Sequence, residues 1–346
     1  MLTRDFDYDL PPELIAQQPV EPRDASRLLV VQRSSGQLEH RRFGDLLDYL
    51  RPGDLLVANE TRVIPARLQA RKVPSGGRVE LLLLARRSPT VWESLVKGRR
   101  VAVGQRLALL RDSVANAAPL VEGMVTAIAP SGGRIIAFER PIDGLLDTLG
   151  EVPLPPYIHQ HLDDAERYQT VYARERGSVA APTAGLHFTP ALLEQLRQHG
   201  VLWTSVVLHI GLDTFRPVTE ECIEEHHIHT ESCRLSAASA ALINAAKAEG
   251  RRVIAVGTTA VRVLETAARG QPRGVAPWEG DTDLFIYPGY RFAVVDALIT
   301  NFHLPRSSLL MLVAAFAGYE LMLRAYHTAI GERYRFYSLG DSMLII

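Results

Sequence analysis

Six short β-rich runs follow one another between Arg67 and Glu139, and no helix-length segment interrupts them. Turn-forming stretches such as Pro74–Gly77 and Ser131–Gly133 separate the runs, as in antiparallel strands joined by short connections. Strands at this spacing predict a small antiparallel barrel or sandwich. The proline-rich segment 152–156 cannot continue a strand or a helix, so the β-rich block is expected to end there.

Helix and strand patterns alternate on both sides of this block. Upstream, Leu28–Gln32 and Asp54–Asn59 have the composition of strands. Downstream, the order β-α-β-α-β indicates an α/β layer with some parallel strands. The expected strands there are Val201–His209, Val253–Val256 and Leu284–Tyr287, and the expected helical segments are Ala191–His199, Ala237–Glu249, Thr259–Arg269 and Leu309–Tyr326.

A length of 346 residues exceeds the usual size of one compact core. We therefore expect an α/β protein made of a discontinuous α/β main domain with an inserted small antiparallel β-barrel domain. The expected boundaries are 1–65 for the first part of the main domain, 66–152 for the barrel, and 153–346 for the second part, which carries most of the active site.

The formal net charge of -1 conceals a strong local asymmetry. Between Arg62 and Arg111 there are twelve lysines and arginines against two glutamates, a net of +10. Such a block is either a plain solvated surface or a surface that contacts a phosphate backbone.

The first seven residues carry three charges and no apolar run, so they do not resemble a secretory signal. The longest apolar stretches, Leu81–Ala85 and Leu309–Phe316, fall short of the roughly 20 residues that cross a bilayer. Two cysteines are too few to staple the chain, which fits a reducing compartment. We expect a cytoplasmic protein with no membrane partner.

One cluster has the composition of a metal site. On a helix, its cysteines and two of its histidines would share one face, but the segment has no helix signal, and we expect a polar loop at a pocket and no metal. The residues are Cys222, His226, His227, His229, Glu231 and Cys233.

Three polar loops are candidate ligand sites. Val179–Phe188 is a run of small residues before a capped helix, which suits close approach to a ligand and equally suits tight packing. Gly257–Thr259 follows a buried strand and precedes a helix, where open α/β sheets hold ligands. Neither a dinucleotide nor a P-loop motif is present, and Arg262 and Glu265 on that helix could simply pair with each other.

Two further segments contain groups suited to a nucleoside. Tyr287 and Tyr290 flank a Pro-Gly turn and offer aromatic faces for stacking, although such turns also pack without a ligand. Asn301 and His303 precede a helical segment and offer amide and imidazole groups to a base or a ribose.

A series of short strings, spread over nearly the whole chain, matches the pattern of one known family. The strings are Asp5–Pro11, Arg23–Leu29, Asn59–Arg67, Glu166–Tyr172, Ala181–Phe188, Leu208–Gly211, Phe215–Val218, His226, His229, Glu231, Ala255–Thr259, Ile286–Tyr290, Leu298–Pro305 and Tyr334–Phe336. In this order they resemble the S-adenosylmethionine:tRNA ribosyltransferase-isomerase family of queuosine biosynthesis. The sequence departs from the family pattern at Glu60, Asp213 and Ala260, and near the C-terminus at Leu339 and Ser342.

The resemblance implies an enzyme that moves the ribosyl part of S-adenosylmethionine onto 7-aminomethyl-7-deazaguanine at the wobble position of a tRNA. The implied product is epoxyqueuosine, with adenine and methionine released. The sulfonium acidifies the carbon beside it, so the resemblance implies S-adenosylmethionine as a co-substrate and no prosthetic group. A general base and help for the departing adenine are still needed.

Within this resemblance, His187, His209 and His303 are the candidate proton carriers, and we favour His187 as the base. Thr258 and Thr259 are expected to hold the methionine carboxylate, and the basic barrel to contact the anticodon arm. The other candidate binding residues are Thr183, Arg216, Arg262, Tyr287, Tyr290 and Asn301.

Two other functions remain open at this point. A non-catalytic tRNA-binding protein would explain the basic block but would not require the polar loops. A different nucleoside transferase or hydrolase would explain the loops but not the charge asymmetry. No heptad seam or long exposed apolar stripe is evident, and the family resemblance implies a monomer.

Overall fold

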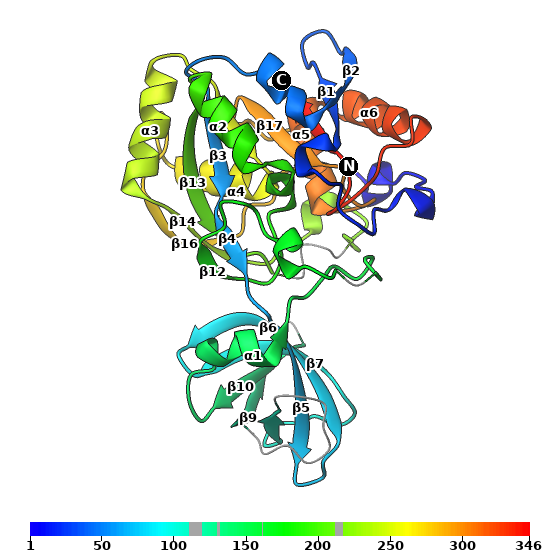
Figure 1. Cartoon of the computed structure of the whole chain (residues 1–346), viewed down its shortest axis with the longest axis vertical. Helices are drawn as coiled ribbons and strands as arrows, with labels where there is room; N and C mark the ends of the chain where they lie inside the picture. Colours follow the sequence, from blue (N-terminus) through cyan, green and yellow to red (C-terminus); the bar gives the residue numbers. More distant parts are fainter. Residues whose placement is uncertain (111–119, 130–131, 161, 212–216) are drawn as a thin grey trace. The chain divides into compact units, whose positions relative to one another are not determined.

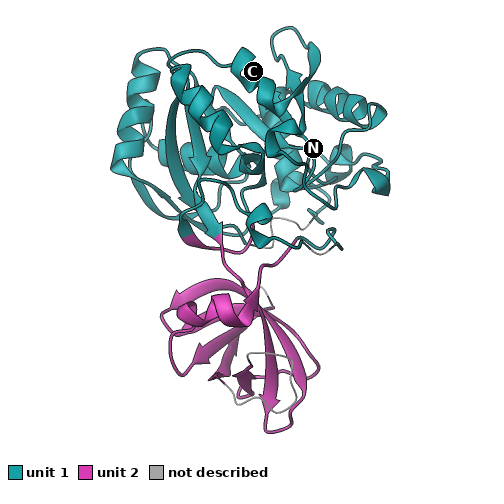
Figure 2. Cartoon of the chain, viewed as in Figure 1, with its two compact units in different colours: residues 1–62, 155–175, 181–346 teal, residues 63–154, 176–180 magenta. Residues whose placement is uncertain are grey.

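The computed structural model describes residues 1–110, 120–129, 132–160, 162–211 and 217–346. These residues form two compact units, shown in teal and magenta in Figure 2. Unit 1 contains Met1–Arg62, Pro155–Glu175 and Ala181–Ile346, and unit 2 contains Val63–Leu154 and Arg176–Ala180. The chain therefore leaves unit 1, builds most of unit 2 and returns.

Unit 1 is built on a nine-stranded mixed sheet in the order β16-β14-β13-β3-β15-β17-β18-β1-β2 (Figure 1). Its centre is parallel, because β13, β3, β15 and β17 run in one direction, whereas β18 lies antiparallel to β17 and parallel to β1. The bounds are β1 Arg27–Val31, β2 Leu38–Arg42, β3 Leu55–Asn59, β13 Leu202–Leu208, β14 Glu231–Leu235, β15 Val253–Val256, β16 Trp278–Thr282, β17 Ala297–Asn301 and β18 Ser342–Ile345.

Helices cover the sheet of unit 1. Every second side chain of a strand points to the same face of the sheet. On one face, Leu56 of β3 and Ile254 of β15 share a core with Leu192 and Leu196 of α2. Helices α3 and α4 contact β13 and β15. The bounds are α2 Pro190–Gln198, α3 Ala237–Ala248, α4 Thr258–Ala268, α5 Ser308–Ala317 and α6 Tyr319–Gly331.

Side-chain caps fix where three of these helices begin. Thr189 Oγ1 accepts the Leu192 amide at 3.1 Å before α2, whose first residue is Pro190. Ser236 caps α3 and Ser307 caps α5 in the same way. Each cap satisfies an amide that has no partner inside its helix.

Unit 2 is a closed antiparallel barrel. Six strands follow the order β5-β6-β7-β10-β9-β8, and β8 pairs back with β5, so the barrel itself has no free edge. The bounds are β5 Arg67–Val73, β6 Arg78–Ser88, β7 Val91–Lys97, β8 Arg106–Leu109, β9 Val121–Ile128, β10 Arg134–Phe138, α1 Leu146–Leu149 and β11 Gly150–Glu151, which pairs with β5. Strands β4 (Thr61–Val63) and β12 (Glu175–Ser178) form a separate two-stranded sheet.

The predicted fold class is confirmed: a discontinuous α/β unit carries an inserted antiparallel barrel. One local prediction is wrong, and one helical segment is divided in two. Leu284–Tyr287 belongs to no strand, and the neighbouring strand is β16. The helical segment 309–326 is two helices, because Gly318 has φ = 92° and ends α5.

In the described part of the chain, no single helix is long and apolar enough to cross a membrane, and the one pair that passes by length and composition, α5 with α6, is bent by 114°.

Candidate active site

A cleft opens at the carboxyl edge of the parallel strands in unit 1. The segments that follow β13, β15 and β17 all reach it, as expected where neighbouring parallel strands end together. Its space, including the part open to solvent, is about 620 Å³. The lining residues are Tyr157, Ala181–Ala184, Ile210, Gly257–Thr259, Thr300–Leu304, Ser307, Leu309, Tyr337 and Ser338.

Helix α4 begins at the wall of this cleft. Gly257 stands before it with φ = 88°, a conformation that suits glycine, and supplies no side-chain cap. Unlike α2, α3 and α5, this helix therefore leaves its first amides without a capping side chain. The hydroxyl of Thr259 is buried and has no hydrogen-bond partner among the residues that the structure describes. A helix end of this kind favours an anionic group.

A chain of hydrogen bonds connects the cleft to His187. The hydroxyl of Thr183 donates to Asn301 Oδ1 at 2.9 Å, so the amide nitrogen of Asn301 faces His187 Nε2 at 3.3 Å. Nε2 is therefore the acceptor, and Nδ1 carries the proton that is donated to Ser26 Oγ at 2.8 Å. The neighbours thus assign one neutral tautomer to His187.

Burial keeps two of the candidate histidines neutral. The pKa of His187 is lowered to about 3, first by burial and then by the positive charges of Arg335 and Arg23. Burial alone lowers the pKa of His303 to about 3. Both imidazoles are uncharged near pH 7 and hold protons weakly.

His303 lies on the cleft wall itself. Its Nε2 is 2.7 Å from Thr300 Oγ1, and its main chain is fixed by the hydroxyls of Tyr326 and Tyr8. These contacts fix the imidazole of His303 in the segment between β17 and α5.

The structure brings together five of the eleven predicted site residues. Thr183, Thr258, Thr259, Asn301 and His303 line the cleft. His187 lines an adjoining pocket and reaches the cleft through Asn301.

Of the other predicted residues, those that the structure describes do not line the cleft. His209, Tyr287 and Tyr290 are not among the residues that line the cleft, and Arg216 lies outside the described residues. Burial also lowers the pKa of His209, whose Nδ1 is buried without a partner.

Arg262 is not placed to contact a ligand in the cleft. It is 5% exposed and forms a buried ion pair with Glu231, and it also donates to the carbonyls of Leu284 at 3.1 Å and Thr282 at 3.3 Å. Glu231 in turn accepts the Gly211 amide at 3.0 Å. The guanidinium therefore joins α4 to β14 and to the segment after β16.

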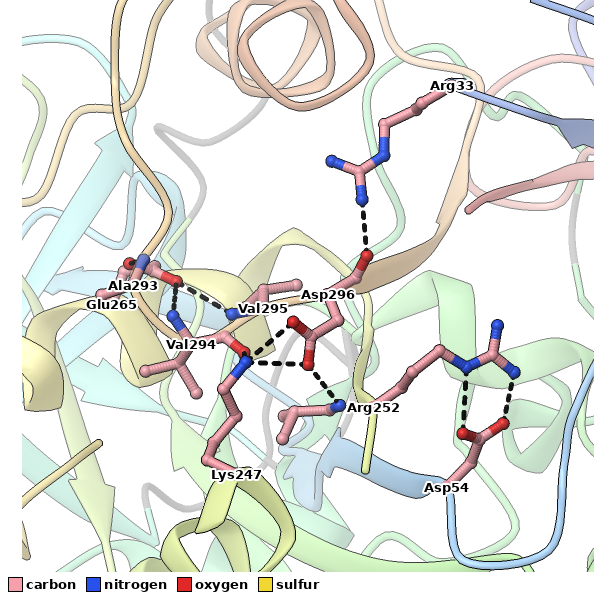
Figure 3. A network of polar contacts seen from close by, with 10 residues as sticks. Arg33, Asp54, Lys247, Arg252, Glu265, Ala293, Val294, Val295 and Asp296 are labelled. Atoms are coloured by element: carbon pink, nitrogen blue, oxygen red, sulfur yellow. Dashed lines mark hydrogen bonds and ion pairs between the residues drawn. The ribbon is translucent and has the colours of Figure 1, made fainter. Parts of the chain in front are cut away.

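Arg262 does not pair with Glu265 either. Figure 3 shows the Glu265 carboxylate facing the chain before β17, where it accepts the amides of Ala293, Val294 and Val295 at 2.9–3.2 Å. The hydroxyl of Tyr290 donates to the same carboxylate at 3.2 Å. Both charged residues of α4 thus hold neighbouring main chain in place.

Some cleft residues were missed by sequence reasoning. Tyr157 Oη and Ser338 Oγ are 2.6 Å apart, and they come from distant segments of the chain. The string Tyr334–Phe336 pointed to the Ser338 region, whereas nothing local marked Tyr157.

The segment from Cys222 to Cys233 forms no α-helix, and Cys233 lies in β14. The described residues contain no group of three or more His, Cys, Asp or Glu that could hold a metal ion.

Fold and cleft together define an α/β protein with a cleft at the carboxyl edge of its parallel strands and a barrel inserted in its chain. The family described as "Queuosine biosynthesis protein" matches residues 3–345. The chain belongs to this family, and the resemblance seen in the sequence is confirmed.

Named relatives match the chain from end to end. The S-adenosylmethionine:tRNA ribosyltransferase-isomerase of Moorella thermoacetica is 57% identical and that of Symbiobacterium thermophilum 56%, each with 100% of both chains covered. A crystal structure of an S-adenosylmethionine tRNA ribosyltransferase from Thermotoga maritima is 42% identical, covers 99% of this chain and 100% of its own, and has a TM-score of 0.57. These relatives are enzymes by name.

Proposed function

We propose that the protein transfers the ribosyl part of S-adenosylmethionine to 7-aminomethyl-7-deazaguanine in the wobble position of a tRNA, forming epoxyqueuosine and releasing adenine and methionine. The observation that carries this proposal is the cleft at the uncapped start of α4, in a chain that matches enzymes of this name over their full length.

S-adenosylmethionine carries a carboxylate and an adenosyl group, and the cleft offers a partner for each. The first amides of α4 and the hydroxyl of Thr259 suit the carboxylate. Asn301, held by Thr183, and the imidazole of His303 suit a nucleoside. We also propose that the protein needs no prosthetic group, is located in the cytoplasm and acts as a monomer.

His187 stays our candidate for the base, with His303 and His209 as alternatives. Nε2 of His187 is the unprotonated nitrogen, and only the Asn301 amide separates it from the cleft. Replacing His187 by alanine should abolish turnover while S-adenosylmethionine still binds. Near-normal turnover would exclude it as the base.

The reaction is tested by adenine release from S-adenosylmethionine with and without a tRNA that carries 7-aminomethyl-7-deazaguanine. Adenine and methionine should appear only with that tRNA. Folded protein that binds tRNA and releases neither product would instead be a non-catalytic binding protein.

The barrel is our candidate for the RNA contact. Arg71 of β5 lies directly opposite Arg78 of β6, although like charges in that arrangement are unfavourable. Lys72 donates to the carbonyls of Arg99 and Arg100, which brings these two exposed arginines to the same part of the barrel. A concentration of positive charge in one part of the barrel is consistent with binding to phosphates.

Reversing the charge of Arg71, Lys72, Arg99 and Arg100 to glutamate should weaken tRNA binding and spare S-adenosylmethionine binding. Unchanged tRNA affinity would refute the role of the barrel. A matched control reverses four exposed arginines of unit 1, namely Arg41, Arg197, Arg273 and Arg291.

A further inference from the structure

A second pocket adjoins the cleft in unit 1 and is lined by three arginines. Its space, including the part open to solvent, is about 290 Å³. Four segments that are far apart in the sequence meet there, and each overlaps one of the strings noted above, namely Arg23–Leu29, Glu166–Tyr172, Ala181–Phe188 and Tyr334–Phe336. The lining residues are Pro19, Val20, Arg23, Ser26, Arg167, Leu186, His187, Arg335 and Ser338–Gly340.

Main-chain carbonyls, rather than carboxylates, hold most of these guanidinium groups. Arg23 donates to the carbonyls of Gln169 at 2.7 Å and Glu166 at 2.8 Å. Arg167 donates to the Val20 carbonyl at 2.8 Å and pairs at 2.9 Å with Glu21, whose side chain is 74% exposed. Carbonyl contacts fix a guanidinium without neutralising its charge.

Arg335 has a donor that no residue in the described part of the chain accepts. Its Nη1 donates to the Gln18 carbonyl at 3.0 Å, and its Nε lies 3.9 Å from Asp341, beyond a hydrogen bond. Its Nη2 is buried without a hydrogen-bond partner. A buried cationic donor without an acceptor is costly unless a ligand completes it.

The pocket and the cleft share a wall. Ser338 lines both, and the ring of His187 lies between Ser26 on one side and Asn301 on the other. A group bound in the arginine pocket would therefore be close to a nucleoside bound in the cleft.

We propose that the arginine pocket is a phosphate subsite that takes a phosphodiester group next to the modified nucleotide of the RNA substrate. The proposal rests on the proposed function, and it adds a second RNA contact beside the reaction site. Three planar guanidinium groups suit the several acceptor oxygens of a phosphodiester. The carboxylate of S-adenosylmethionine has another partner, the start of α4 in the cleft.

The test uses the full-length protein with Arg335→Gln and Arg167→Gln, and Arg335→Lys as the conservative variant. Exposed Arg273, beyond the far end of α4, supplies the control Arg273→Gln. The probes are S-adenosylmethionine and an anticodon stem-loop RNA that carries 7-aminomethyl-7-deazaguanosine. Each glutamine variant should lose about tenfold in RNA affinity with unchanged affinity for S-adenosylmethionine, and Arg335→Lys should lose less.

A second arm locates the phosphate. A methylphosphonate, which is neutral, replaces the phosphodiester on the 5′ side or the 3′ side of the modified nucleotide. One of these replacements should weaken binding to the wild type by about tenfold and have little further effect on Arg335→Gln, because both changes remove the same contact.

Three results would overturn the proposal. The first is RNA affinity unchanged in both glutamine variants. The second is a loss confined to S-adenosylmethionine affinity, which would assign the pocket to the carboxylate. The third is that each methylphosphonate weakens RNA binding to Arg335→Gln by the same factor as it weakens RNA binding to the wild type. Adenine release by the wild type is measured in parallel: release with no effect of the variants rejects only the subsite, whereas no release with any RNA rejects the proposed function as well.

Discussion

Replacing Arg262 by methionine should destabilise unit 1 without touching the ligand site. The side chains of Arg262 and Glu231 are 6% and 7% exposed, so the change removes a buried counter-ion from the Glu231 carboxylate. Breaking a buried pair in this way costs about 3–5 kcal/mol. The carbonyls of Leu284 and Thr282 lose a donor as well, and we expect a loss of about 4 kcal/mol in the free energy of unfolding.

Urea unfolding followed by tryptophan fluorescence measures this loss. A Trp92→Phe background silences unit 2, so that Trp203 and Trp278 report on unit 1 alone. The double variant Arg262→Met/Glu231→Leu removes both charges and should recover at least about 2 kcal/mol relative to the sum of the single losses.

Arg269→Met is the matched control, because its pair with Asp283 is 52% and 68% exposed and should contribute less than about 1 kcal/mol. The reasoning is refuted if Arg262→Met unfolds like the control. It is refuted equally if that variant keeps its stability and loses affinity for S-adenosylmethionine, since Arg262 would then be a binding residue.

Stability should fall on acidification, because His187 and His303 have folded-state pKa values of about 3 against 6.5 for the free side chain. The unfolded state then binds more protons below pH 6.5, so each histidine should cost about 2 kcal/mol between pH 7 and pH 5, and His187→Asn should reduce that slope in urea titrations. Gly185→Ala should destabilise unit 1 by about 1–3 kcal/mol and lower turnover, because the added methyl would lie 1.9 Å from Tyr172 Oη; a Tm equal to wild type would contradict this. Glu265→Gln should lower the Tm and leave RNA affinity unchanged, since its carboxylate binds only main-chain amides and Tyr290; hydrogen exchange at residues 293–295 should rise, and unaltered exchange there would refute the role.

The strands of the barrel were predictable because alternation and turn residues are local signals. Arg67–Val73 is a strand in both the prediction and the structure. Leu284–Tyr287 was mispredicted because its buried apolar side chains look like those of a strand. Its first carbonyl is bound by Arg262 instead of a neighbouring strand, and no local pattern reveals that partner.

The same distinction applies to the site. Asn301 ends β17, and Thr258, Thr259 and His303 come shortly after the ends of β15 and β17. The edge of the sheet on which they lie could therefore be inferred from the sequence. The arginine pocket could not be inferred, because its walls meet only through tertiary packing. The buried ion pair of Arg262 could not be inferred for a related reason, because its partner Glu231 lies on β14, far away in the sequence.

The position of β18 has a consequence for synthesis. This strand comes last in chain order among those described, yet it lies inside the sheet, between β17 and β1. During translation, the edges of β1 and β17 that pair with β18 stay unpaired until β18 has been synthesised. All strands of the barrel have already emerged by then. Because Tyr337–Gly340 lie just before β18 and line the cleft or the arginine pocket, unit 1 completes these two pockets late in synthesis.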